Sequence, residues 1–466
     1  MSQPDLALLS VQQLSEQLRT RRVSPVDVTD AYLARIASQD PKLQSFVEVY
    51  AEDARLAARG ADAAIRAGHA VGPLHGIPIA LKDLIEIEGK TVTGGCEVWR
   101  DRKATRTATL ARRLMAQGMI VLGKTHTVEF AMGGWGTNSV RGTPWNPWDP
   151  KRKRTPGGSS SGSGVAVAAG LAPWAVGTDT GGSVRLPASW CGITGLKTTI
   201  GRVSTYGVLP LSPTLDTPGP MARSVEDAAL LYLAMQGPDP LDRLTERVPA
   251  TESLPHLKRG VRGMRLARMP EVERQHASAE VLAAYDASLA QLERLGAEIV
   301  KVDLPFLFAD VAAFNLRIMA AESYAILHEL IDDEKAPLDP HVRPRIAAGR
   351  TITAQAYLDA LRIREEMKLK YAAALDGIDA LLTPTTMTTA VPLEEVDQTK
   401  APAHFTRFGN FLDLCAVALP NGMDAGGLPT SLQIVCRAYD EATALRIGWA
   451  YQNATEWHLR RPPAAA

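Results

Sequence analysis

Two clusters of glycine and serine lie close together in the chain, and they constrain the fold more than any other feature. The first cluster spans residues 157–164 and the second spans residues 177–185. Between them, residues 165–171 predict a short helix and residues 174–177 predict a strand. Dense glycine allows a backbone to turn tightly and to approach other groups closely. The sequence therefore predicts two tight loops on an α/β framework that can bring their hydroxyl groups together.

The rest of the chain predicts the same fold class. From residue 76 onwards, short apolar strands alternate with helices, which is typical of a sheet with helices on both faces. We therefore expect one large α/β domain over residues 71–466, built on a mixed or parallel sheet, with a variable region at about residues 235–400. The expected strands are residues 77–81, 119–122, 174–177, 298–302, 378–383 and 432–435, and the expected helices are residues 107–117, 165–171, 278–295, 353–375 and 441–454.

Residues 1–70 predict a helical segment that packs on this domain. Ser10 and Gln13 have the spacing of a capping box, and Ser24 is followed by Pro25 at the first helical position and by Asp27 in the first turn. A third helix is expected at about residues 50–67. Because these helices are amphipathic, they could contribute to a homodimer as well as to the core.

Composition excludes some classes of partner. Lysine and arginine total 51, and so do aspartate and glutamate, so no net field attracts nucleic acid or an anionic membrane. The cationic run at residues 151–154 is expected to be a solvated loop rather than a phosphate site. No apolar run reaches about 18 residues, the length that a membrane span needs. Four scattered cysteines, and a start at residues 1–5 without a secretory signal, favour a cytoplasmic protein.

A lysine at the end of the first apolar strand is a candidate general base. Residues 77–81 are apolar and lead directly into Lys82. A serine hydroxyl is a poor nucleophile until a base removes its proton, and an amine acts as a base only when it is neutral. An apolar environment lowers the pKa of lysine and favours the neutral form. The alternative is a salt bridge between Lys82 and an acid such as its neighbour Asp83.

The second glycine cluster can stabilise an oxyanion. Thr180, Gly181 and Gly182 offer consecutive backbone N–H groups with little side-chain bulk, directly before Ser183. Such donors stabilise the negative charge that forms when a nucleophile attacks an amide carbonyl. The alternatives are a flexible linker or an anion-binding loop. The first cluster lacks the Gly-Lys-Ser/Thr ending of a phosphate loop, and no apolar strand leads into it, so neither nucleotide motif is present.

The histidines predict no metal site. All nine are spread singly, without the spacing of paired ligands, and we expect neither a metal nor another cofactor. His126 lies near the serine clusters and could support a Ser-His mechanism. That alternative is weaker because no Gly-x-Ser-x-Gly turn between a strand and a helix accompanies it.

These motifs together resemble the amidase signature family, whose hallmark is a Ser–cis-Ser–Lys triad on a mixed α/β sheet. The resemblance spans nearly the whole chain and keeps the family's order. It therefore implies an amidase signature domain over residues 71–466. The matching segments are residues 74–83, 157–164, 177–188, 192–198, 216–224 and 427–442.

Carried over by position, the resemblance implies that Lys82 is the base, that Ser159 bridges after a cis peptide bond, and that Ser183 is acylated. The two serines are 24 residues apart, which is the family's spacing. That spacing selects them over the neighbouring serines Ser160, Ser161 and Ser163.

The resemblance also implies the surroundings of the triad. Thr180, Gly181 and Gly182 would form the oxyanion hole together with the amide of Ser183. Asp179 and Arg185 would brace the loop rather than react. The acyl pocket would be lined by Met132, Gly133, Gly134 and Trp135, and the variable region at about residues 235–400 would supply much of the remaining substrate pocket.

The expected activity is hydrolysis of a C–N bond in a small-molecule amide, with aryl amides, esters or carbamates as further substrates. One alternative is the A subunit of a tRNA-dependent amidotransferase, where the same triad frees ammonia from glutamine for a partner protein. Another is an allophanate- or biuret-type amidohydrolase, which residues 410–414 resemble faintly. Met132, Trp135 and Trp190 favour a pocket for uncharged, partly aromatic acyl groups.

Overall fold

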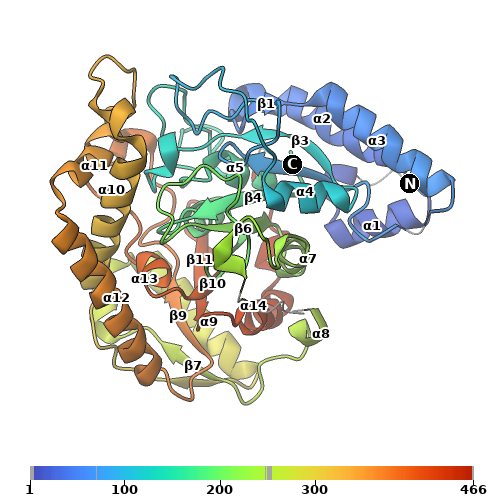
Figure 1. The fold of residues 1–466 in the computed structure, drawn as a ribbon. Coiled ribbons are helices and arrows are strands. Elements are labelled where there is room, and N and C mark those ends of the chain that lie inside the picture. Colours follow the sequence, from blue (N-terminus) through green and yellow to red (C-terminus); the bar gives the residue numbers. More distant parts are fainter. Residues whose placement is uncertain (1–4, 70, 247, 249–253, 464–466) are drawn as a thin grey trace.

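Eleven strands in the described part of the chain form a single mixed sheet that runs through the molecule (Figure 1). The structure is a computed structural model that describes residues 5–69, 71–246, 248 and 254–463. The prediction that the N-terminus carries no secretory signal rests partly on residues 1–4, which lie outside the described residues. The strands follow the order β1-β3-β2-β4-β6-β5-β10-β11-β9-β7-β8. Their bounds are β1 Phe46–Val49, β2 Pro78–Lys82, β3 Ile120–Thr125, β4 Trp174–Asp179, β5 Thr194–Lys197, β6 Thr217–Ala222, β7 Arg265–Arg268, β8 Glu298–Val300, β9 Ala380–Pro384, β10 Cys415–Met423 and β11 Pro429–Cys436.

The sheet is mixed, as the sequence predicts. Strand β2 pairs in parallel with β3 and β4, and β7 pairs in parallel with β8 and β9. The remaining pairs are antiparallel. Parallel pairing of β2 with β4 brings the carboxyl ends of both strands to one edge of the sheet, where catalytic groups of α/β proteins are commonly found.

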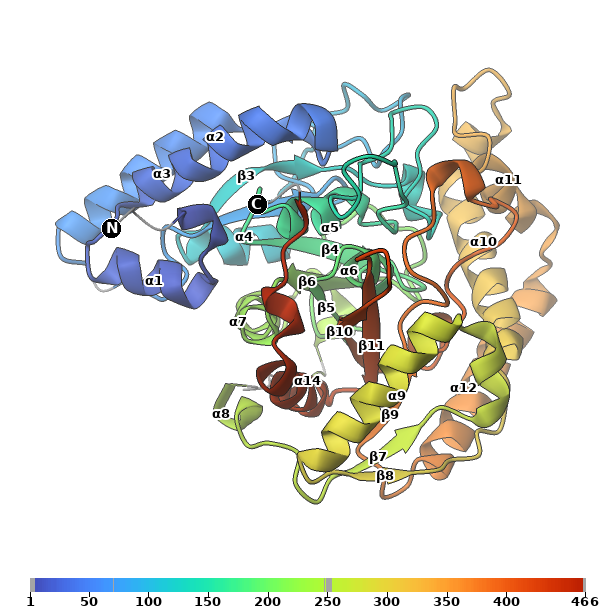
Figure 2. The ribbon, with the colours of Figure 1, turned by 180° about the vertical axis from the view of Figure 1, so that it is seen from behind.

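Helices cover both faces of the sheet (Figure 2). Helices α5 and α6 pack on one face, and α7, α9 and α14 pack on the other. Helices α10 to α12 lie beside the sheet, with α10 packed against α11, α12 and α13. The helix bounds are α1 Val11–Arg19, α2 Pro25–Leu43, α3 Ala51–Arg66, α4 Thr109–Ala116, α5 Ser161–Ala168, α6 Arg185–Trp190, α7 Val225–Met235, α8 Leu254–Leu257, α9 Ala279–Arg294, α10 Phe308–Asp332, α11 Arg343–Ala347, α12 Ala354–Ala374, α13 Arg407–Phe411 and α14 Glu441–Thr455.

The N-terminal segment is partly different from its prediction. Helix α1 begins with the expected capping box of Ser10 and Gln13, and α2 begins with a capping box of Ser24 and Asp27. However, β1 is a strand that pairs with β3 and forms the edge of the sheet. Residues 1–70 therefore are not purely helical, because a four-residue strand is too short to show an alternating pattern. No helix within the described ranges is both long enough and apolar enough to span a bilayer.

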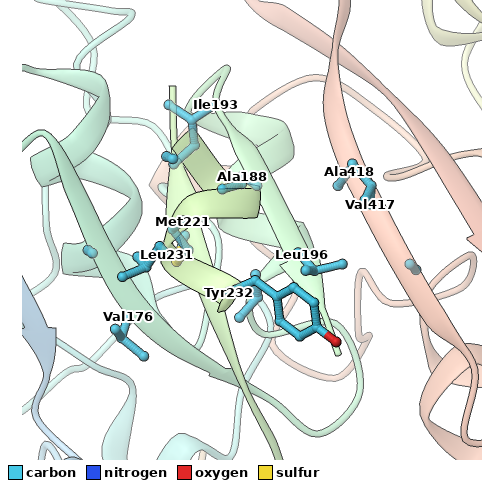
Figure 3. Close-up of a cluster of buried hydrophobic side chains, with 14 of the residues drawn as sticks. Val176, Ala188, Ile193, Leu196, Met221, Leu231, Tyr232, Val417 and Ala418 are labelled. Carbon is cyan, nitrogen blue, oxygen red and sulfur yellow. The ribbon is translucent and has the colours of Figure 1, made fainter. Parts of the chain in front are cut away.

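The core is centred on the sheet strands that carry the serine loops. Figure 3 shows side chains from α6, α7 and strands β4, β5, β6 and β10 packed together. Val176, Leu196, Met221, Tyr232 and Val417 are all fully buried there. Such close packing holds the strands rigidly, so loops at the strand ends start from fixed positions.

Candidate active site

Lys82 lies at the end of β2 and is fully buried. Its Nζ donates hydrogen bonds to Ser159 Oγ at 2.7 Å and to Thr178 Oγ1 at 2.8 Å. Burial lowers the pKa of Lys82 to about 7, while the nearby charges of Asp216 and Asp179 act in the opposite direction. A large fraction of Lys82 is therefore neutral near pH 7 and able to accept a proton.

Lys82 does not form the alternative salt bridge to Asp83. The carboxylate of Asp83 faces Lys124, at 3.5 Å from its Nζ, and accepts hydrogen bonds from the amide and hydroxyl of Thr93. Among the described residues, Lys82 has no acid within ion-pair distance. Thr178, which is its second hydroxyl partner, was not identified from the sequence.

Ser159 follows a cis peptide bond between Gly158 and Ser159. The carbonyl of Ser159 accepts hydrogen bonds from the amide of Val128 at 3.2 Å and the hydroxyl of Thr127 at 3.1 Å. The next residue, Ser160, donates its amide to the carbonyl of Ser183 at 3.2 Å. The two serine loops are therefore in direct contact, with the Lys82–Ser159 pair beside them.

The neighbouring serines are used inside the structure. Ser160 Oγ donates to the carbonyl of Thr178 at 3.2 Å, and Ser163 Oγ shares a hydrogen bond with Thr125 Oγ1 at 2.7 Å. Both are fully buried, as is Ser161. Ser183, in contrast, is 7% exposed and lines a cavity.

Three backbone amides of the second loop are free to bind an oxyanion. The N–H groups of Thr180, Gly181 and Ser183 have no acceptor within the part of the chain that the structure describes. The amide of Gly182, which we expected to be a further donor, instead donates to Asp179 Oδ1 at 2.7 Å. Gly182 therefore fixes the loop, and the other three amides remain available.

Asp179 and Arg185 brace this loop, as expected. The Asp179 carboxylate accepts the amide of Val184 at 3.1 Å and two donors of Arg185 at 2.9 and 3.0 Å. Burial opposes ionisation, but the charge and hydrogen bonds of Arg185 hold the pKa of Asp179 well below its usual range. Arg185 also bonds to Gln433 at 2.7 Å and Asn410 at 2.6 Å, which ties the loop to β11 and α13.

The cavity beside Ser183 has a volume of about 500 Å³. Met132, Gly133, Gly134 and Trp135 line one part of it. Trp190 does not belong to the lining, and instead stacks on Trp135 with ring centroids 5.4 Å apart. The other walls come from α10, α11 and residues 398–407, and these include Leu316, Arg317, Met319, Ala320, Arg345, Ala348, Gln398 and Arg407.

Three arginines in this lining were missed from the sequence. Arg317, Arg345 and Arg407 lie in segments without a recognisable motif, and only the fold brings them to the cavity. Most of the remaining lining is apolar, as the sequence predicts, and the three arginines add a positive charge that it does not predict.

The histidines do not join the serine site. His126 is buried with its Nε2 at 3.1 Å from the carbonyl of Arg141, and its ring contacts no serine hydroxyl among the described residues. The fold does bring Glu273, His276 and His404 together, with one possible ligand atom of each within 4.8 Å. Glu273 already accepts hydrogen bonds from His404 at 2.8 Å and from the amide of Phe308 at 2.8 Å.

Comparison with known proteins identifies the family. The family model described as Amidase matches residues 27–445. The A subunit of glutamyl-tRNA(Gln) amidotransferase from Roseiflexus castenholzii is 38% identical over 97% of each chain. The chain therefore belongs to the amidase signature family, whose members are hydrolases that act on C–N bonds.

Solved structures agree with this assignment. One, described as a vestigial protein complex that reveals the evolutionary origins of an s-triazine catabolic enzyme, superposes with a TM-score of 0.90 and is 32% identical, covering 96% of this chain and 98% of that one. The peptide amidase from Stenotrophomonas maltophilia gives a TM-score of 0.86 and 30% identity, covering 97% of this chain and 98% of that one. Both matches extend over nearly the whole fold.

Proposed function

We propose that this protein hydrolyses the C–N bond of a small amide through an acyl-enzyme on Ser183. The observation that carries the proposal is the buried Lys82, whose Nζ lies 2.7 Å from Ser159 Oγ and whose pKa is about 7. Neutral Lys82 takes the proton of Ser159, and Ser159 takes the proton of Ser183 as Ser183 Oγ attacks the carbonyl carbon. The amides of Thr180, Gly181 and Ser183 stabilise the oxyanion.

The tetrahedral intermediate then collapses. The C–N bond breaks, and the leaving nitrogen receives the proton that Ser159 and Lys82 hold, so that ammonia or an amine departs. A water molecule attacks the acyl-enzyme through the same proton path and releases the acid. Every transferred proton passes through Ser159 to or from Lys82, and Ser183 carries the acyl group, so the three groups act as one unit.

A second candidate is the A subunit of a tRNA-dependent amidotransferase. It is favoured by the relative that is 38% identical over 97% of each chain, and the names of the sequence relatives support it better than an enzyme that acts alone. The chemistry on Ser183 would be the same, with glutamine as the amide and ammonia passed to a partner protein.

The experiment that separates the two candidates measures ammonia release. The chain alone is assayed with a panel of primary amides, p-nitroanilides, allophanate, malonamate and glutamine, and then again with glutamine after co-expression with B and C subunits. Turnover of small amides by the chain alone supports an independent amidase. Turnover of glutamine only in the presence of the partners supports the amidotransferase reading. Ser183→Ala must abolish either activity.

Location and assembly complete the proposed function. We place the protein in the cytoplasm because its four cysteines are free and buried. The binding partner is a small amide substrate, and neither nucleic acid nor a membrane surface is expected to bind. A homodimer stays a prediction, which light scattering of the purified chain measures.

A further inference from the structure

The mostly apolar cavity beside Ser183 carries several basic side chains and, among the described residues, no acid in its lining. Arg317, Arg345, Arg407 and Lys400 belong to the lining, and no aspartate or glutamate does among the described residues. Lys400 pairs with Asp397 at 3.3 Å. The three arginines make no ion pair with any acid that the structure describes. The charge of Asp339 acts on Arg345 from outside the lining, so within the described residues the positive charge of this wall is balanced only in part.

Arg407 is the arginine nearest to the predicted chemistry. It begins α13, and a Cβ atom built on Gly181 would lie 3.5 Å from its Cγ and 3.9 Å from its Nε. Gly181 belongs to the loop after β4, whose free amides stabilise the oxyanion in the proposed reaction. The guanidinium of Arg407 has no hydrogen-bond acceptor within the described ranges. A cation with five donors therefore lies beside the reacting loop without a partner.

Two neighbours reinforce this arrangement. Arg345 donates to the carbonyl of Met132 at 3.1 Å and to the carbonyl and side-chain oxygens of Gln398 at 2.6 and 3.1 Å. These acceptors are neutral, so they orient Arg345 and leave its charge in place. Burial, and then repulsion by Arg345, lower the pKa of Arg407 to about 10, so Arg407 remains protonated at neutral pH.

Asn315 supplies a second unpartnered polar group at the same place. Its side chain is fully buried, neither its oxygen nor its nitrogen has a partner among the described residues, and its Oδ1 lies 3.7 Å from the same built Cβ of Gly181. Buried polar groups in native proteins normally have a partner. Asn315 itself does not line the cavity, so Arg407 is the group that can reach a ligand there. The unpartnered Asn315 beside it makes the surroundings of Arg407 polar.

We infer that the substrate is a small amide that carries a carboxylate and no ammonium group, with the carboxylate bound by Arg407. Arg407 is half-buried and lines the cavity. A partly buried guanidinium is stabilised by an accompanying anion, and its planar donors match a carboxylate in a bidentate manner. Arg345 and Arg317 add positive potential. An ammonium would meet these cations and would find no acid in the lining that the structure describes. This inference rests on the proposed function and names its substrate class.

Matched amides test the class directly. Malonamate, succinamate and glutaramate are each compared with the neutral amide of the same carbon number, namely propanamide, butanamide and pentanamide. Glutaramate is also compared with glutamine, which differs from it by the α-amino group. We expect kcat/KM for the best anionic amide to exceed that of its neutral partner by about 100-fold or more, since a site built for a polar group rejects analogues that lack it. We expect glutaramate to exceed glutamine.

Variants assign the effect to Arg407. Arg407→Gln should remove most of the preference for the anionic amide, and Arg407→Lys, which keeps the charge but not the fork of donors, should retain part of it. Arg362→Gln is the matched control, because Arg362 is exposed on α12 and changes the net charge equally. Labelling of Ser183 by a neutral fluorophosphonate reports whether each variant is folded and reactive. If wild type is not labelled, the proposed function fails rather than this inference.

Protection of Ser183 gives a readout that does not depend on turnover. Malonate, succinate or glutarate should slow fluorophosphonate labelling of wild type and of Arg362→Gln, and should slow it much less in Arg407→Gln. The inference is overturned if neutral amides are turned over as fast as their anionic partners. It is also overturned if no dicarboxylate protects Ser183, or if protection is equal in wild type and in both Arg407 variants.

Discussion

At the scale of single residues, burial lowers the pKa of Lys82, Lys124 and Lys197 alike, and their hydrogen-bond partners distinguish them. Lys124 donates to the carbonyl of Ile85 and faces the Asp83 carboxylate, and Lys197 donates to two carbonyls at 2.8 Å. Carbonyl and carboxylate oxygens accept hydrogen bonds from the amine but have no proton to give it. Lys82 contacts only hydroxyls, which can donate as well as accept. Neutral Lys82 therefore loses no partner, which suits a general base.

The pH dependence of kcat/KM tests this difference. Since protonated Lys82 cannot accept the proton of Ser159, activity should be low below about pH 6 and rise as Lys82 is deprotonated, with an apparent pKa near 7 rather than near the usual value of lysine. Lys82→Ala should lower kcat by about 100-fold or more and remove this limb. A wild-type profile that rises only near the ordinary pKa of lysine, about pH 10, would contradict the assignment. Steady-state rates of an uncharged amide across about pH 5 to 10 provide the measurement.

At the scale of elements, the conformation of the loop after β4 depends more on Gly182 than on its neighbour Gly181. Gly182 has φ +133°, and a Cβ there would come within 2.9 Å of the Thr406 Cβ and closer to its hydroxyl. Gly181 has only ordinary contacts, the nearest at 3.5 Å. Residues with a side chain rarely adopt this backbone conformation, and their Cβ atom would clash with Thr406.

We expect Gly182→Ala to destabilise the protein by about 1–3 kcal/mol and to abolish labelling of Ser183, because the loop must move. Gly181→Ala is the matched variant and should keep the wild-type unfolding midpoint. Thermal unfolding and fluorophosphonate labelling of both variants measure the effect. Equal behaviour of the two variants would show that the loop is not held as described.

Some elements could be predicted from sequence and others could not, for physical reasons. Helices α1 and α2 have caps that are local signals, and both begin where expected. Strand β6 contains Pro218 and Pro220, which normally argue against a central strand. The two prolines are tolerated because β5 pairs only with Met221 and Ala222 of β6. On the β5 side, Pro218 and Pro220 therefore have no partner in the ladder. This compensation depends on the neighbouring strand and is invisible in a local pattern.

At the scale of the whole molecule, the candidate site combines a triad encoded by short sequence motifs with a cavity wall from segments far away in the sequence. Lys82, Ser159 and Ser183 lie in short motifs, so the resemblance could assign them from sequence. The cavity wall comes from residues 313–352 and 398–407, which reach the serine loops only through the packing of α10 to α13. The family resemblance implies that the middle of the chain builds much of the pocket. It could not indicate that three arginines would meet there.

The fold also brings together Glu273, His276 and His404, and this cluster allows a test of metal dependence. The proposed reaction uses only Lys82, the serines and backbone amides, so dialysis against a chelator should leave kcat unchanged. Metal content and ammonia release are measured before and after dialysis. A loss of activity that zinc restores, and that His404→Ala reproduces, would contradict a mechanism centred on Ser183.

The central claim is that Ser183 becomes acylated, and mass spectrometry of the labelled peptide tests it most directly. Cleavage after Arg154 and Arg185 yields one peptide that contains every serine of both clusters, so fragmentation of that peptide must locate the adduct. After brief exposure to a fluorophosphonate, wild type should carry one adduct on Ser183, and Ser183→Ala should carry none. An adduct on Ser159, Ser160 or Ser163 of wild type would contradict the account.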